Sequence, residues 1–494
     1  MNRKELVRTT PESVGISSRE LLKMLKSLDS CGTEMHGIMI ARHGKVITEG
    51  WWAPYTAETV HICHSFGKSY VATAVGAACT QGLLSVEDRM ADIFADDLKK
   101  YGVADEGNMA KLRLKHVLTM SNGMTIHALA GKEIVKNYLT TEVDWVPGTK
   151  FMYNTAGSCM LGEAVRRVTG KSVYGFLKES VLDHIGFDTE HFYWMTFENG
   201  LHAAPGVASC TENNLRLGML YLQDGMWDGH QLIDREWIRQ ATQKQIDNAR
   251  CGYGYQLWMH ELPDTFEFNG GHGQFSVMSR PLDIALSINQ AASEPHDTDA
   301  VGRIMDQYLL GREWPESMPE DPEGLAELNA WLKSRRIPQP ESRPIHDFLD
   351  RWIGRYQVEE GHFHLHPELR PFGDLNVNAD FYTNRDPFVR TMEIRKSENG
   401  LLLFCNDDPG LEVRLDGQWI PQPAQSVMPA YQYSCAAGTV DDEDLTITQW
   451  YYQTCFKTRL VFRREGENVR LYIRKERLHD DVPYIYMEAL LKRE

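Results

Sequence analysis

The sequence has no run of about 20 apolar residues, the length that a helix needs to cross a bilayer. Residues 1–15 include basic side chains but no apolar stretch after them, so they do not resemble a secretory signal. Positive charge is scarce, since 52 Lys and Arg residues stand against 69 Asp and Glu residues and the formal net charge is −17. An acidic protein repels phosphate groups, which argues against nucleic acid and anionic membranes as partners. We therefore expect a cytoplasmic protein without a membrane span.

The sequence also lacks any Cys-x-x-Cys pair, which argues against a zinc ribbon. Its nine cysteines are an odd number and are scattered along the chain. Several lie in apolar surroundings, as Cys79 does after Ala77 and Ala78. Buried free thiols in a reducing compartment are the simplest interpretation.

A chain of 494 residues, 42% of them hydrophobic, is too long for one ordinary domain. Pro, Glu and Arg are concentrated between residues 313 and 345, around one short helical stretch at 325–332. Such a composition is typical of a linker. We therefore predict a first domain at residues 1–312, a linker at 313–345 and a second domain at 346–494.

The two predicted domains differ in the period of their apolar residues. The first begins with a helix capped by Ser17 and continues into a hairpin at residues 36–52. Small apolar residues at 65–79 then predict a helix buried on every side, and the mixture indicates an α/β or α+β domain with a helical subdomain. In the second domain, apolar and polar residues alternate in short segments such as 469–474. This period of two predicts a small antiparallel barrel or sandwich.

The strongest chemical signal is the pair Ser65 and Lys68, which form an S-x-x-K pattern. A serine hydroxyl becomes a good nucleophile only when a base removes its proton. A lysine three residues further along a helix lies one turn away on the same face, and burial favours its neutral, basic form. The pattern by itself is common, so a surface helix with Ser65 as its cap and a solvated Lys68 is the alternative.

Two further segments carry candidate residues. Tyr153 follows a Pro-Gly turn, and a tyrosine near a buried lysine is a possible proton shuttle. The glycine-rich segment 269–275 contains Gly271 and His272, and its backbone can approach a ligand closely. The alternatives are a core tyrosine and a simple hairpin turn.

Together and in this order, the three segments resemble the serine β-lactamase and penicillin-binding-protein family. The similarity is greatest to class C β-lactamases, family VIII esterases and related D-amino-acid peptidases, and it covers roughly residues 8–310. Segments 11–15, 114–123, 161–172 and 253–258 resemble further landmarks of that family. The resemblance implies an α+β fold, in which helices flank an antiparallel sheet beside a helical subdomain. The C-terminal region resembles the lipocalin-like β-barrels appended to some of these hydrolases.

The resemblance also implies roles for individual residues. Ser65 would be the acylated nucleophile, with Lys68 and Tyr153 as its proton-handling partners. The oxyanion hole would combine the backbone N–H of Ser65 with one near Gly271. The family's Y-x-N motif ends in Thr155 here, and its K-T-G strand is replaced by glycines with His272. Because both departures remove polar contacts to a β-lactam, we expect an esterase, amidase or peptidase with weak or no β-lactamase activity.

No metal or organic cofactor is needed for that chemistry. His362, His364 and His366 would share one face of a strand and are a weaker candidate for a zinc or nickel site. The expected partner is a small ester, amide or peptide substrate, and the oligomeric state stays open. The alternatives are a non-catalytic binding protein of the same fold, a true β-lactamase or D-amino-acid peptidase, and a chain whose barrel is the functional module.

Overall fold

The hairpin predicted near the N-terminus forms strands β1 (Glu34–Arg42) and β2 (Lys45–Trp51) in the computed structural model of the chain. The turn between them is formed by His43 and Gly44, both with positive φ. The structure describes residues 5–125, 133–197, 200–292, 296–340, 349–363, 388–406, 410–423, 433–441, 443–455, 457–476 and 485–494.

The main sheet of the first region has six antiparallel strands in the order β2-β1-β11-β10-β9-β8. The four other strands are β8 (Trp258–Met259), β9 (Thr265–Gly270), β10 (Gln274–Ser279) and β11 (Ile284–Ala291). Strand β8 contains only two residues. Just before it, Gln256 has a φ of 60° and turns its side chain toward the carbonyl groups of Val117 and Leu118.

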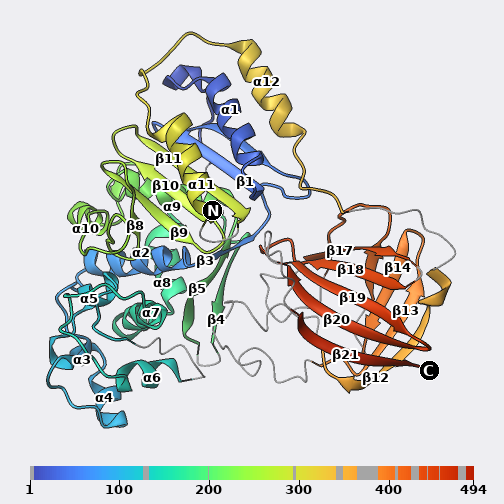
Figure 1. The fold of residues 1–494 in the computed structure, drawn as a ribbon. Helices are drawn as coiled ribbons and strands as arrows, with labels where there is room; N and C mark the ends of the chain where they lie inside the picture. The colour runs from blue at the N-terminus through green and yellow to red at the C-terminus, as the bar shows by residue number, and fades with distance from the viewer. Residues whose placement is uncertain are drawn as a thin grey trace.

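Successive residues of β1 point to opposite faces of this sheet. Ile38 and Ile40 belong to one hydrophobic core, and Met39 and Ala41 belong to another. Figure 1 shows α1, α11 and α12 gathered on one side of the sheet and α9 and α2 on the other. These helices are α1 (Ser18–Asp29), α2 (Gly67–Thr80), α9 (Thr211–Leu222), α11 (His296–Met305) and α12 (Pro322–Lys333). The expected α+β fold, a sheet flanked by helices with a helical subdomain, is confirmed.

The rest of the first region consists of short helices and two small sheets. The helices are α3 (Met90–Ile93), α4 (Ala95–Tyr101), α5 (Leu114–Leu118), α6 (Ile134–Thr140), α7 (Thr155–Thr169), α8 (Val173–Leu177) and α10 (Arg235–Ala241). The sheets are β3-β5-β4, formed by His61–His64, His202–Ser209 and Phe192–Thr196, and the pair β6 (Met226–Trp227) and β7 (His230–Gln231). Short 3-10 or π segments lie at Glu12–Val14, Met109–Lys111, Lys178–Leu182 and Asp306–Leu310. Another, at Leu349–Arg351, comes just before the first strand of the C-terminal region.

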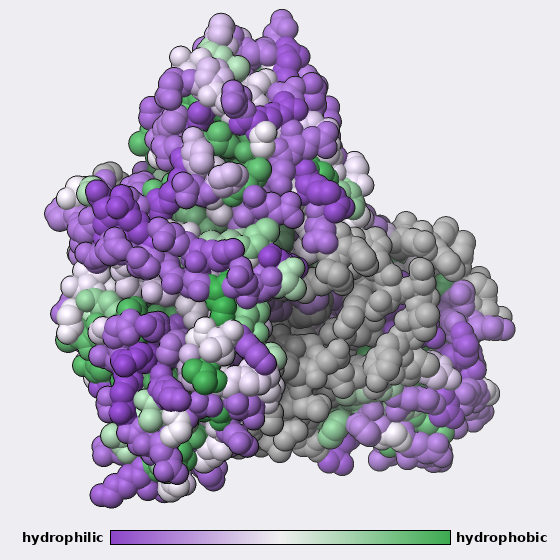
Figure 2. All heavy atoms as spheres, turned by 60° about the vertical axis from the view of Figure 1, so that its left-hand side comes forward, coloured by the Kyte–Doolittle hydropathy of each residue, from purple (hydrophilic) through white to green (hydrophobic). Residues whose placement is uncertain are grey.

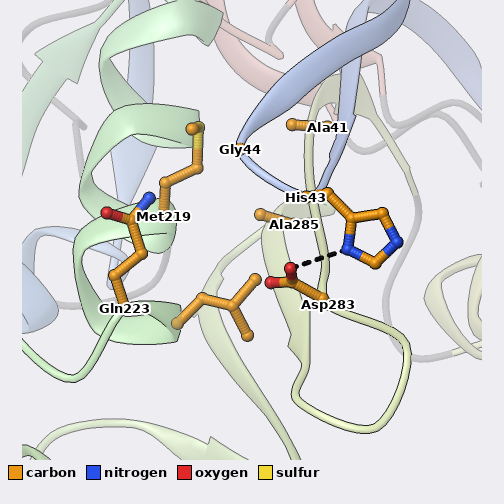
Figure 3. A pocket seen from close by; sticks show the side chains of 8 residues that line it. Ala41, His43, Gly44, Met219, Gln223, Asp283 and Ala285 are labelled. Carbon is orange, nitrogen blue, oxygen red and sulfur yellow. Dashed lines mark hydrogen bonds and ion pairs between the residues drawn. The ribbon is translucent and has the colours of Figure 1, made fainter. Parts of the chain in front are cut away.

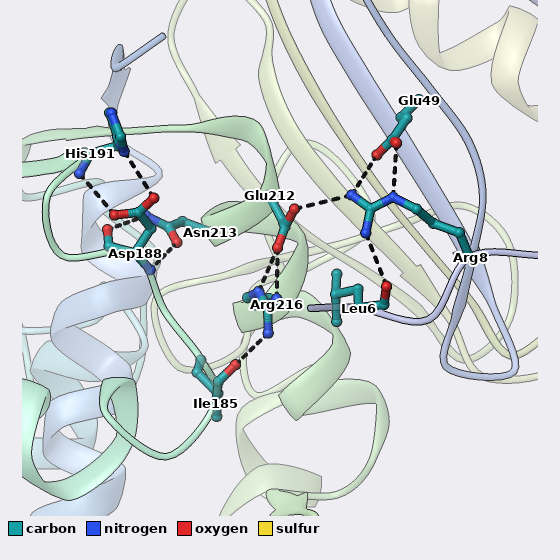
Figure 4. Close-up of polar contacts among 9 residues, drawn as sticks. All are labelled: Leu6, Arg8, Glu49, Ile185, Asp188, His191, Glu212, Asn213 and Arg216. Carbon is teal, nitrogen blue, oxygen red and sulfur yellow. Dashed lines mark hydrogen bonds and ion pairs between the residues drawn. The ribbon is translucent and has the colours of Figure 1, made fainter. Parts of the chain in front are cut away.

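Helix α9 carries a buried ion pair that fixes the chain around it (Figure 4). The Arg216 guanidinium, only 1% exposed, donates two hydrogen bonds to Glu212 at 2.9 and 2.7 Å and a third to the carbonyl of Ile185. Arg8 approaches the other oxygen of Glu212 at 3.4 Å and also pairs with Glu49 on β2. The helix is therefore tied to the N-terminal segment and to the loop before β4.

The C-terminal region is a β-barrel, as the alternating pattern predicts. Its strands are β12 (Gly354–Gly361), β13 (Thr391–Lys396), β14 (Gly400–Cys405), β15 (Leu411–Arg414), β16 (Gln422–Pro423), β17 (Tyr433–Val440), β18 (Asp444–Trp450), β19 (Lys457–Glu465), β20 (Asn468–Glu476) and β21 (Ile485–Arg493). The order is β15-β14-β13-β12-β21-β20-β19-β18-β17-β16, and a β15–β17 pairing closes the ring. Its interior is filled by apolar side chains, Leu445, Ile447 and Leu471 among them.

The barrel packs directly on the first region through the end of β18 and the segment 451–455. The backbone N–H of Ile62 on β3 donates to the carbonyl of Gln453 at 2.8 Å. Trp450 lies in the same hydrophobic core as Ile38 and Ile40. Lys457 Nζ donates to the buried carboxylate of Glu34 at 2.7 Å. The barrel therefore contacts the strand that leads directly to Ser65.

The surface of the described residues is mostly polar on the face that Figure 2 presents, with apolar atoms scattered among polar ones. No helix in the described part of the chain combines the length and apolarity that a bilayer crossing requires. All nine cysteines lie among the described residues, none of them forms a disulfide, and five are buried.

Candidate active site

Ser65 lies in the turn between β3 and α2. The N–H of Phe66 donates to the carbonyl of Cys63 at 3.2 Å, and α2 begins two residues after the serine. Gly67 allows this tight junction, because a Cβ atom there would lie 2.1 Å from the carbonyl oxygen of Ala204 on β5. The side chain of Ser65 is thus presented at the start of a buried helix.

Lys68 lies in the first turn of α2 and is 1% exposed. Its Nζ donates to Ser65 Oγ at 2.8 Å. The helix is buried from Gly67 to Ala78, so Lys68 is not the solvated lysine of a surface helix. A buried amine within hydrogen-bonding distance of a hydroxyl is suited to exchange a proton with it.

Tyr153 lies above this pair, with Lys68 Nζ 4.9 Å from the centre of its ring. The ring stacks on Trp258 at a centroid distance of 5.8 Å. The backbone before it is held by the N–H of Met152, which donates to the carbonyl of Met120 at 2.7 Å. The residue after it, Asn154, caps α7 by accepting a hydrogen bond from the N–H of Gly157. Tyr153 is therefore fixed from both sides.

Gln256 joins the two helices that carry these residues. It is 2% exposed, its carbonyl accepts a hydrogen bond from Ser69 on α2, and its side chain accepts one from Ser158 on α7 at 2.6 Å. Its amide nitrogen donates to the carbonyls of Val117 and Leu118 at 3.0 Å. Gln256 therefore holds α2, α7 and the end of α5 together.

The glycine-rich segment lies against the backbone of the serine. A Cβ atom on Gly270 would lie 2.0 Å from the carbonyl oxygen of Cys63 and 3.1 Å from the nitrogen of Phe66. Only a glycine permits this approach, which brings the next residue, Gly271, to the wall of the same cleft as Ser65. His272 has a φ of 59° and lies beside His64, at a ring-centroid distance of 5.4 Å.

A cleft of about 770 Å³ opens over these groups. Ser65, Tyr153 and Gly271 line it, together with side chains from the loop 249–251 and from α11. Of the charged residues along its walls, four carry carboxyl groups and two carry guanidinium groups: Glu261, Glu267, Asp299, Asp306, Arg250 and Arg303. The excess of carboxyl groups favours a neutral or cationic substrate over an anionic one.

One wall of the cleft contains a cluster around His260. Its Nε2 lies 3.5 Å from a carboxylate oxygen of Glu267 and 3.5 Å from one of Asp306. Burial raises the pKa of the Glu267 carboxyl, and His260 and a hydrogen bond from Asn269 offset only part of that effect. Burial raises the pKa of Asp306 as well. Since a raised carboxyl pKa marks many functional sites, this wall is a candidate for substrate recognition.

The other residues that the sequence singles out lie elsewhere. Thr155 is buried at the first position of α7 and is not among the described residues that line the cleft. His362 lies after β12 in the barrel, with its ring 4.8 Å from that of Phe388. His364 and His366, the other two members of the weaker metal candidate, lie outside the described residues.

A second, smaller cavity lies at the β1–β2 turn against α9 (Figure 3). Its volume is about 210 Å³, and His43 and Asp283 form a hydrogen bond of 2.9 Å beside it. Neither Ser65 nor Tyr153 lines this cavity, and its other walls are largely apolar. The larger cleft is therefore the candidate active site.

Several residues of the site carry no signal in the sequence that points to it. Gln256 stood within a segment noted only for its resemblance, and no pattern linked His260 to Asp306. Arg250 lies in a loop without a recognisable sequence pattern, and its guanidinium is 5.4 Å from the centre of the Trp258 ring. These residues can be recognised only from the tertiary structure, because they come together only when strands β8 and β9 and helix α11 are assembled.

The antiparallel sheet, its flanking helices and the serine at the start of a buried helix form a fold of the β-lactamase and transpeptidase kind. The chain belongs to the Beta-lactamase family, whose sequence model matches residues 29–308. This family and its named relatives are mostly hydrolases.

Three proteins illustrate the similarity. An uncharacterized protein of Alkalihalophilus pseudofirmus is 22% identical over 46% of this chain and 71% of its own length. Lovastatin esterase of Penicillium rubens is 25% identical over 34% of this chain and 49% of its own length. A Bacillus anthracis structure, assigned provisionally as a 6-aminohexanoate-dimer hydrolase, superposes with a TM-score of 0.51 and 16% identity over 65% of this chain and 90% of that one. The last likeness concerns the fold alone.

Proposed function

We propose that the protein is a serine hydrolase that cleaves an ester or amide bond through an acyl-enzyme on Ser65. The observation that carries this proposal is the hydrogen bond of 2.8 Å between Lys68 Nζ and Ser65 Oγ at the floor of the cleft. As Ser65 Oγ attacks the substrate carbonyl, its proton passes to Lys68 or Tyr153. The same groups return a proton to the leaving group, and water then releases the acyl chain.

The developing oxyanion would be bound by backbone N–H groups of Ser65 and of the segment at Gly271. The close contact of Gly270 with the backbone of Cys63 supports this arrangement, because it holds the two segments side by side. Preorganised N–H donors of this kind contribute several kcal/mol to acyl transfer, on the order of 3 kcal/mol each.

Esters or small amides are the proposed substrates, in preference to β-lactams. Segment 269–274 contains no lysine to hold a ring carboxylate, and carboxyl groups outnumber guanidinium groups along the cleft. A buried carboxylate without a partner is costly to bind. The esterase among the relatives is in keeping with this preference.

We also propose that residues 1–312 form the hydrolase domain, 313–345 the linker and 346–494 a lipocalin-like barrel domain. The barrel would serve the hydrolase rather than act alone, because Gln453 binds the backbone of β3 next to Ser65. A chain ending at residue 340 would test this. A fragment with full esterase activity would mean that the barrel has a separate role.

The test of the function is steady-state hydrolysis of p-nitrophenyl butyrate by Ser65→Ala. Ser334→Ala removes an exposed hydroxyl at the end of α12 and is the matched control. We expect the first variant to lose turnover while it stays folded and the second to keep it. Turnover by folded Ser65→Ala would refute the assignment and leave the non-catalytic binder as the better interpretation.

A further inference from the structure

Three residues from distant parts of the chain meet beside Ser65. They are His64 at the end of β3, His272 in the turn between β9 and β10, and Cys455 in the barrel segment 451–455. One ring nitrogen of each histidine and the Sγ of Cys455 all lie within 4.8 Å of one another. His64 Nε2 and Cys455 Sγ are 3.4 Å apart although 391 positions separate them in the sequence.

We propose that this His64–His272–Cys455 cluster binds one Zn²⁺ ion. A site of two imidazoles and a thiolate favours zinc over harder cations such as Mg²⁺ or Ca²⁺, which prefer oxygen ligands. With Zn–N distances of about 2.0–2.1 Å and Zn–S of about 2.3 Å, the ligand atoms of a tetrahedral site lie roughly 3.3–3.6 Å apart. The distance from His64 to Cys455 already falls in that range. The third ligand atom needs to move by no more than about 1.5 Å.

The histidine at the turn is oriented as a metal ligand usually is. His272 Nδ1 lies 3.2 Å from the carbonyl oxygen of Ala292. Because a carbonyl only accepts, Nδ1 carries the proton and Nε2 keeps its lone pair. Ligating histidines are commonly held in this way by a backbone carbonyl.

The backbone around the cluster is held in place before any ion arrives. His64 and His272 both have positive φ, at 50° and 59°, a conformation that is uncommon outside glycine and tends to persist at functional sites. The segment that carries Cys455 is fixed by the hydrogen bond from Ile62 to Gln453 and by the buried ring of Tyr451.

The position of the cluster gives the ion a role in the hydrolase. His64 immediately precedes Ser65, and His272 immediately follows Gly271, so a shared ion would fix the spacing of the two segments proposed to form the oxyanion hole. Cys455 would at the same time attach the barrel to the hydrolase domain. This role rests on the proposed function, whereas the binding of zinc does not.

Zinc binding is measured on the full chain, purified without a histidine tag and treated with a chelator, by titration against a chromophoric zinc indicator. We expect one Zn²⁺ per chain, bound more tightly at higher pH because Cys455 loses its proton on binding. Co²⁺ in place of Zn²⁺ should give a thiolate-to-metal charge-transfer band and the visible bands of tetrahedral cobalt.

Cys455→Ser should abolish the charge-transfer band and weaken zinc binding by at least the roughly 10–100-fold that loss of an outer-shell partner costs. Cys31→Ser is the control, because Cys31 is also partly buried but lies outside the cluster, and this variant should bind zinc as the unmodified chain does.

If Cys455→Ser is unfolded, the cobalt spectrum of the unmodified chain decides by itself. No stoichiometric zinc, or a cobalt site without a thiolate band, would overturn the proposal. If zinc binds but fluorophosphonate labels Ser65 at the same rate with and without it, zinc binding is confirmed and its proposed role at the oxyanion hole is wrong.

Discussion

Replacing Gly270 by alanine tests how closely the glycine-rich strand must approach the serine. The new methyl group would lie 2.0 Å from the carbonyl oxygen of Cys63, and 3.0 Å is about the lowest separation that real Cβ atoms show. The obstacle is backbone rather than the end of a flexible side chain. The strand or the turn that holds Ser65 must therefore shift by about 1 Å.

Such a shift should affect both stability and rate. Overpacking of this kind typically costs about 1–3 kcal/mol of unfolding free energy. A displacement of about 1 Å between reacting groups lowers the rate on the order of 10²-fold. We therefore expect Gly270→Ala to lose activity out of proportion to its lost stability, measured by kcat/KM for p-nitrophenyl butyrate and by urea unfolding.

Gly162→Ala is the matched control for this experiment. Its new methyl group would lie 3.5 Å from Val173, an ordinary contact, and it replaces a glycine inside α7. It should leave the rate unchanged and the stability equal or higher by up to about 1 kcal/mol. Unchanged kcat/KM in Gly270→Ala would refute the claim that the close approach of the two segments organises the site.

Four further results are expected. Tyr153→Phe and Lys68→Ala should each lower kcat by about 10²-fold or more. The fold-loss in kcat of the double variant should be much smaller than the product of the two single fold-losses, because the groups act as one unit, and kcat measured for all three variants tests this. Arg216→Met should lower the urea-unfolding free energy by about 3 kcal/mol or more, because it leaves the carboxylate of Glu212 poorly paired in the interior, and a loss under 1 kcal/mol would contradict the account. Burial lowers the pKa of His61 to about 3. Below about pH 6.5 the imidazole is therefore protonated in the unfolded chain but stays neutral in the folded chain. The free energy of unfolding should fall by up to about 1.4 kcal/mol per pH unit as the pH drops toward 3, measured by urea unfolding at several pH values. The kcat/KM for p-nitrophenyl butyrate should exceed that for nitrocefin under one condition, and the reverse order would favour a true β-lactamase.

The sequence could predict those features that depend on local pattern. The hairpin of β1 and β2, the buried helix α2 and the barrel strand β20 all follow from apolar periodicity, and each is present. The pairing of Ser65 with Lys68 was also predictable, because three residues along the chain fix their proximity. Tyr153 could be brought to them only by resemblance, since 85 or more positions separate it from the pair.

Contacts between distant segments could not be predicted. Gln256 joins three helices through hydrogen bonds that have no sequence period. His260 follows β8 and Asp306 begins the π-helical segment after α11, so the two meet only in the folded chain. In the sequence Cys455 is only one of nine scattered cysteines, yet the packing of the barrel on β3 places it against His64.

The most direct test is to label the nucleophile covalently, because a fluorophosphonate loses fluoride when an activated serine attacks its phosphorus. The chain is incubated with a fluorophosphonate, and the modified residue is identified by mass spectrometry of its peptides. We expect one adduct per chain, located on Ser65, and none in folded Ser65→Ala. An adduct on another residue, or labelling of Ser65→Ala at the unmodified rate, would contradict it.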